Sequence, residues 1–138
     1  MTPLQKVRWL ILEKLRKWGQ ELPEITADNI DALWDVCHED PTYDKAYDAQ
    51  NEVRCSGEKT GIKARSWSRH YECEEVAAKC PDGTWVGWTY WHGGGKHGEP
   101  GEVEWMEDAY DVTLTEEQKT VTVRTFAAAN AKEHTDGK

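Results

Sequence analysis

The stretch YECEEVAAKCPDGTWVGWTYWH, residues 71–92, decides the fold class. At its centre is PDGT, residues 81–84, which is a strong turn signal. Proline favours turns, and glycine readily adopts the positive φ that a tight hairpin requires. We therefore expect one strand over about 70–80 and a second over about 84–92, paired antiparallel.

The second of these strands carries large rings on both sides. Successive side chains of a strand point to opposite faces of the sheet. One face holds Val86, Trp88, Tyr90 and His92, and the other holds Trp85, Gly87, Thr89 and Trp91. Rings on both faces predict that both faces of the sheet are covered.

Two further strands are expected after this hairpin. They are AYDVTL near 109–114 and TVTVRTF at 120–126, with TEEQKT turning the chain between them. The residues expected to be largely buried in the sheet are Trp85, Trp88, Trp91, Val121 and Val123. The small and polar residues 127–138 predict a flexible tail.

Upstream of the hairpin the apolar residues have helical spacing. A first helix is expected over residues 3–18, since its apolar side chains recur at steps of three and four. Pro3 suits the first turn of a helix and Gly19 suits its end. The repeating apolar face consists of Leu4, Val7, Ile11, Leu15 and Trp18.

A second helix is expected from Thr26, a good N-cap, to the Asp40-Pro41 pair, which can itself start a third helix. Residues 54–68 are interpreted as a basic connecting segment. The fold prediction is α+β, with two or three N-terminal helices followed by a twisted antiparallel sheet of about four strands. The helical region 1–67 and the β region 68–126 are expected to form one compact domain.

The charge of the chain is uneven. The 138 residues carry a formal net charge of −9, and residues 18–52 hold ten acids against Lys45 alone. Such a surface repels phosphates, which favours a basic protein partner over nucleic acid. A solvated helix face explains these acids equally well. The candidate binding residues are Glu21, Glu24, Asp28, Asp31, Asp35, Glu39 and Asp40.

The glycine-rich stretch GGGKHG at 93–98 follows the second strand. It lacks the spacing of a phosphate-binding P-loop, and the acids after it would repel phosphate. We expect a flexible connector, with Lys96 and His97 as adaptable contacts at the rim of a binding surface.

The sheet half also holds residues that bind metal in other proteins, namely His70, Cys73, Cys80, His92 and His97. Their spacing does not repeat the short cysteine pairs of zinc sites, so no metal and no cofactor are expected. Neither Cys73 nor Cys80 lies in a nucleophile signature, so no enzymatic activity is expected. The four cysteines are expected to be free thiols.

No stretch near the N-terminus resembles a signal peptide, and no apolar run is long enough to span a bilayer. The expectation is a cytoplasmic protein without a membrane partner.

Four motifs within residues 68–126 carry a resemblance: DGTWVGWTYW, GGGKHGEP, EWMEDAYDV and EEQKTVTVRTF. This region resembles small uncharacterised proteins encoded by bacteriophages and prophages. In such proteins tyrosine often occupies the position of His92. The resemblance implies a phage origin and a location in the host cytoplasm.

Small phage proteins most often act by binding a host macromolecule. The functional hypothesis is therefore a non-catalytic inhibitor or modulator of a host protein, such as a defence or DNA-processing enzyme, with a basic surface. The alternative hypothesis is a small nucleic-acid-binding module stabilised by zinc.

Overall fold

The computed structural model describes residues 1–94 and 99–129 of the chain. Three helices precede an antiparallel sheet of four strands in the order β1-β2-β3-β4, which confirms the α+β prediction. The helices are α1 (Pro3–Lys17), α2 (Ile30–Cys37) and α3 (Tyr43–Cys55). The strands are β1 (Glu58–Lys59), β2 (Glu72–Lys79), β3 (Trp85–His92) and β4 (Tyr110–Val112), with a 3-10 helix η2 (Pro100–Glu102) between the last two.

The hairpin of β2 and β3 forms as predicted. Its register places Val76 opposite Trp88. In the turn, Gly83 has a φ of +90°, which glycine adopts without steric cost. The Asp82 carboxylate accepts hydrogen bonds from the hydroxyl and the amide of Thr84, at 2.6 and 3.0 Å. These hydrogen bonds, above all that from the hydroxyl, hold the pKa of Asp82 below its ordinary value.

The first helix begins at its predicted position. The second begins at Ile30, with Asn29 and not the expected Thr26 as its N-cap, and it ends at Cys37, before the expected Asp40. In α1 the side chains of Thr2 and Gln5 each accept a hydrogen bond from the other's backbone amide, forming a capping box. Thr26 and Asn29 exchange the same pair of bonds in the turn before α2. The third helix begins at Tyr43, two residues after the expected position at Pro41.

The core lies between the helices and one face of the sheet. Trp88 is fully buried there and stacks at a tilt on Trp105, with ring centroids 5.4 Å apart. Its indole N–H donates to the backbone carbonyl of Arg54, at 3.2 Å. Trp91 is also buried, as predicted, whereas Trp85 is half-buried.

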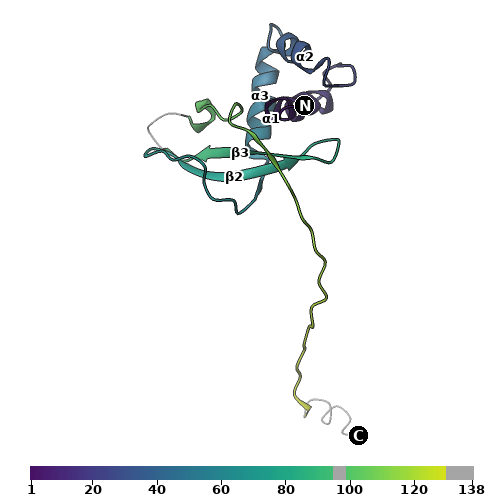
Figure 1. Ribbon diagram of the computed structural model, residues 1–138, viewed down its shortest axis with the longest axis vertical. Helices are drawn as coiled ribbons and strands as arrows, with labels where there is room; N and C mark the ends of the chain where they lie inside the picture. The colour runs from purple at the N-terminus through teal and green to yellow at the C-terminus, as the bar shows by residue number, and fades with distance from the viewer. Residues whose placement is uncertain (95–98, 130–138) are drawn as a thin grey trace.

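The other face of the sheet is covered by the loop of residues 60–71, which connects β1 to β2 (Figure 1). The thiol of Cys73 donates to the backbone carbonyl of Ser66 in this loop. Because the loop lies across the sheet from the helices, the sheet separates the acidic helical region from the basic segment. Both faces are covered, as the rings on β3 predict.

The prediction of a strand at residues 120–126 is wrong. Residues 120–126 pair with no described part of the chain, and Val121 and Val123 are 75% and 84% exposed. The TEEQKT stretch contains no glycine, proline, asparagine or aspartate, so it has little tendency to form a tight turn. Instead β1 completes the sheet, from within the segment interpreted as a connector.

The chain leaves the domain after β4. Residues 113–129 run away from the sheet as an extended segment (Figure 1). Most of the predicted flexible tail, residues 130–138, lies outside the described residues. In the described part of the chain no helix is long and apolar enough to cross a membrane.

Candidate functional site

The seven acids predicted to bind a partner are all exposed on the helical side of the molecule. Asp31 accepts long contacts of 3.3 and 3.4 Å from Gln5 and Arg8 of α1. In the described ranges none of the other six forms an ion pair. We refer to these seven residues, with Asp44, Asp48 and Glu52 of α3, as the acidic helical surface.

Helical spacing aligns these acids in rows. Asp31 and Asp35 are separated by one turn of α2, and Asp44, Asp48 and Glu52 follow each other at the same spacing on α3. Like charges four residues apart destabilise a helix by about 0.2–0.5 kcal/mol per pair. The rows thus carry a small energetic cost, which a bound cationic group would offset.

A surface hollow of about 490 Å³ includes two of these acids. It is lined by Trp18, which follows α1, and by Asp48, Asn51, Glu52 and Cys55 of α3. Trp18 is 41% exposed, although its spacing placed it on the buried face of the first helix. The helix ends at Lys17 and Trp18 is its C-cap, so the ring stands at the margin of the core.

This hollow has the chemistry of a cation site. Two carboxylates attract a positive charge, and the face of an exposed indole attracts an ammonium or guanidinium group through its quadrupole. An arginine side chain can satisfy both at once, since its planar head stacks on rings and binds carboxylates. Sequence reasoning missed Trp18 as a site residue, and its position next to Gly19 is the signal that could have indicated an exposed ring.

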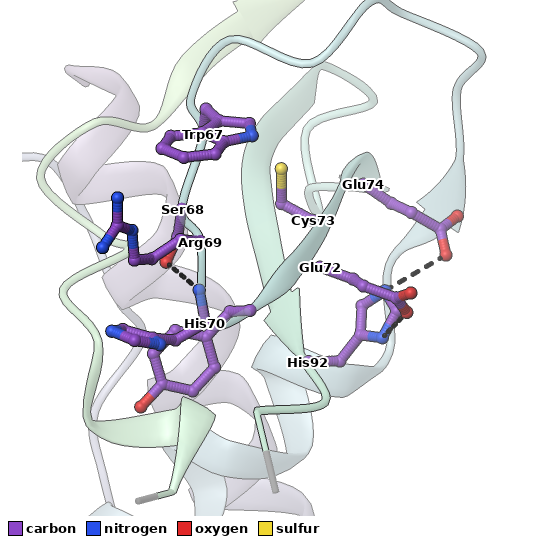
Figure 2. A pocket seen from close by; sticks show the side chains of 9 residues that line it. Trp67, Ser68, Arg69, His70, Glu72, Cys73, Glu74 and His92 are labelled. Carbon is purple, nitrogen blue, oxygen red and sulfur yellow. Dashed lines mark hydrogen bonds and ion pairs between the residues drawn. The ribbon is translucent and has the colours of Figure 1, made fainter. Parts of the chain in front are cut away.

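A second hollow, of about 610 Å³, lies where β2 begins and β3 ends. It is lined by Trp67, Ser68, Arg69, His70, Tyr71, Glu72, Cys73, Glu74 and His92. Figure 2 shows the carboxylates of Glu72 and Glu74 next to the imidazole of His92. The nitrogen to oxygen distances are 3.6 and 3.5 Å, which is long for direct hydrogen bonds.

The surroundings of Cys73 and Cys80 favour the protonated thiol. Burial raises the pKa of Cys73 and, with the charge of Asp82, that of Cys80, so both are protonated thiols at neutral pH. The thiolate is the nucleophilic form of cysteine. All four cysteines are free, as expected.

Three of the candidate metal ligands, His70, Cys73 and His92, line the second hollow, whereas Cys80 lies at the other end of β2. Cys73 lies near the start of β2, whereas Cys80 follows its end, so the seven residue steps between them span about 23 Å. Within the described residues no group of three histidine, cysteine, aspartate or glutamate side chains could hold a metal ion. His97, together with Lys96, lies outside the described residues.

A buried carboxylate under the 60–71 loop was not expected from the sequence. Glu75 is 3% exposed and accepts hydrogen bonds from the hydroxyls of Thr89 and Tyr110, at 2.9 and 2.8 Å, and from the amide of Arg65. The Arg65 guanidinium lies 4.0 Å from the centre of the Tyr110 ring. Burial and the bond to Glu75 raise the pKa of Tyr110 well above its ordinary value. This cluster joins three strands and the loop, so we assign it to stability.

Comparison with known proteins gives no relative: no protein-family model, no curated protein and no solved structure matches the chain.

Proposed function

We propose that the chain is a phage-encoded accessory protein that binds a host protein with a basic surface and inhibits or modulates it without catalysis. A defence or DNA-processing enzyme of the host cytoplasm has the required chemistry, because its nucleic-acid groove is basic. The observation that carries the proposal is the hollow of Trp18, Asp48 and Glu52 on the acidic helical surface.

Binding at this surface has a physical basis in both energy and rate. A field of one sign accelerates encounter with an oppositely charged partner and favours that partner over others. Affinity then comes from a few anchors, among which tryptophan is enriched. Trp18 supplies such an anchor, and the exposed acids of α2 and α3 supply the field.

The non-catalytic part of the proposal is supported by the second hollow. His92 is flanked by two carboxylates, and Cys73 donates its proton to a backbone carbonyl instead of to an imidazole. A nucleophile with a general base within hydrogen-bond reach is the usual sign of covalent catalysis. The thiol of this hollow, Cys73, makes its hydrogen bond to the backbone of Ser66 and not to a general base.

One observation favours nucleic acid as a second candidate partner. Trp67 is 79% exposed on the 60–71 loop, where Lys63 and Arg69 are also exposed. Exposed rings with interspersed cations bind single-stranded nucleic acid by stacking and charge. This candidate site lies across the sheet from the acidic helical surface, so the two can be tested separately.

The proposal is tested by titrating the ¹⁵N-labelled protein with an arginine- and lysine-rich peptide in a ¹H-¹⁵N correlation experiment. We expect the indole signal of Trp18 and the amide signals of residues 28–52 to shift. The double variant Asp48→Lys/Glu52→Lys should bind the peptide at least about tenfold more weakly, or about 1.4 kcal/mol, because attraction becomes repulsion.

The matched control is Glu116→Lys/Glu117→Lys, which makes the same change of net charge on the exposed segment after β4. Its affinity for the peptide should stay within about twofold of the wild type. Salt screens the interaction between distant charges, so only charges near the binding surface affect the affinity. Shifts confined to Trp67 and the 60–71 loop, or tighter binding of a single-stranded oligonucleotide, would reject the proposal in favour of the nucleic-acid alternative.

A further inference from the structure

The segment after β4 has the pattern of a strand but no strand beside it. In TVTVRTF, residues 120–126, valine and threonine alternate and a phenylalanine follows. Val121, Val123 and Phe126 are 75–87% exposed. A β-patterned segment of this kind gains stability only by pairing with a sheet edge, which would satisfy its backbone and cover its apolar side chains.

The sheet offers an edge of matching chemistry. β4 is the last strand in the sheet order, so one side of its backbone ladder is open among the described residues. A surface hollow of about 500 Å³ lies next to it, and Trp85, Val112 and Leu114 contribute to its lining. Leu114 is 48% exposed there. An added strand would cover these apolar groups.

One antiparallel register matches β4 and the residues that follow it to the segment position by position. Apolar side chains face apolar side chains, an acid faces a base, and threonine faces threonine, all of which are favourable cross-strand pairs. The facing pairs are Asp111–Arg124, Val112–Val123, Thr113–Thr122 and Leu114–Val121. A shift by one residue would move the valines to the opposite face of the sheet and lose every match.

We propose that the edge with which residues 120–126 pair belongs to a second copy of this chain. Residues 120–126 of each protomer pair with β4 of the other, forming a symmetric strand-exchanged dimer. The segment runs away from its own sheet (Figure 1). The TEEQKT stretch has no turn residues to bring it back. Reciprocal pairing of one segment and one edge closes into a twofold dimer.

The dimer is tested by sedimentation velocity and light scattering, together with amide hydrogen exchange. At a protein concentration of about 50 μM we expect a mass twice the 15.8 kDa of one chain, because the dimer fraction rises with concentration. We also expect slow amide exchange at residues 121–125. Val123→Pro should shift the mass to that of a monomer, since proline removes a ladder donor and sits poorly in a paired strand. Exchange at 121–125 should then become fast.

The matched control is Gln118→Pro, which places proline in the same exposed segment but outside the paired residues. It should leave the dimer intact, and circular dichroism should show the helix content of both variants unchanged. Three outcomes would overturn the proposal. They are a monomer with fast exchange at 121–125, a monomer with slow exchange there, which indicates pairing with its own β4, and a dimer that survives Val123→Pro.

Discussion

Replacing Trp88 with alanine should lower the free energy of unfolding by about 3–5 kcal/mol, the usual cost of removing a large buried ring. Trp88 is fully buried and its indole donates to the Arg54 carbonyl, so the variant leaves both a cavity and an unpaired acceptor. It also loses the contact with Trp105. Since small domains are stable by only about 5–15 kcal/mol, much of the chain would unfold at 37 °C.

Urea unfolding followed by circular dichroism measures this loss. Trp67→Ala is the matched control, because Trp67 is 79% exposed and its removal should change the unfolding free energy by at most about 0.5 kcal/mol. Equal effects of the two substitutions would show that the helices do not pack on the face of the sheet that carries Trp88.

Glu75→Ala should lower the free energy of unfolding by about 3 kcal/mol. It leaves the hydroxyls of Thr89 and Tyr110 and the amide of Arg65 without their acceptor, and each unpaired buried group costs about 1–3 kcal/mol unless water reaches it. Glu75→Gln keeps an acceptor oxygen, so its loss should be smaller.

Glu74→Ala is the control for this cluster, because Glu74 is the neighbouring glutamate on the opposite face of β2 and its side chain is 37% exposed. Its effect should stay within about 0.5 kcal/mol. A Glu75→Ala variant as stable as Glu74→Ala would mean that the 60–71 loop does not close over the carboxylate.

The parts of the fold that could be predicted are those with local signals. The β2–β3 hairpin follows from PDGT and its flanking alternation. The predicted start of α2 is too early, because Thr26 caps a turn and the helix begins only at Ile30. β1 could not be predicted, since two residues carry no periodicity and the strand exists only because β2 offers an edge. Gly57 lies just before it, where a Cβ would come within 2.6 Å of Val76.

The candidate sites divide in the same way. The exposure of the seven acids follows from their charge, because isolated carboxylates are rarely buried. The burial of Glu75 depends on Tyr110, which is far from it in sequence, and on the 60–71 loop, which is a separate element. Residues 120–126 have a strong strand pattern, yet pairing requires a turn that TEEQKT does not provide. Tertiary context, which the pattern alone does not contain, decides both.

Affinity capture from bacterial lysates tests the proposed function most directly. The wild-type chain should retain one specific protein, Asp48→Lys/Glu52→Lys and Trp18→Ala should each lose it, and Glu116→Lys/Glu117→Lys should retain it. The retained protein should bind with an affinity that falls as salt rises, because charge pairs at an exposed rim are screened. Capture of no specific protein across several hosts, or equal capture by the charge-reversed variant, would contradict a host-binding role for the acidic helical surface.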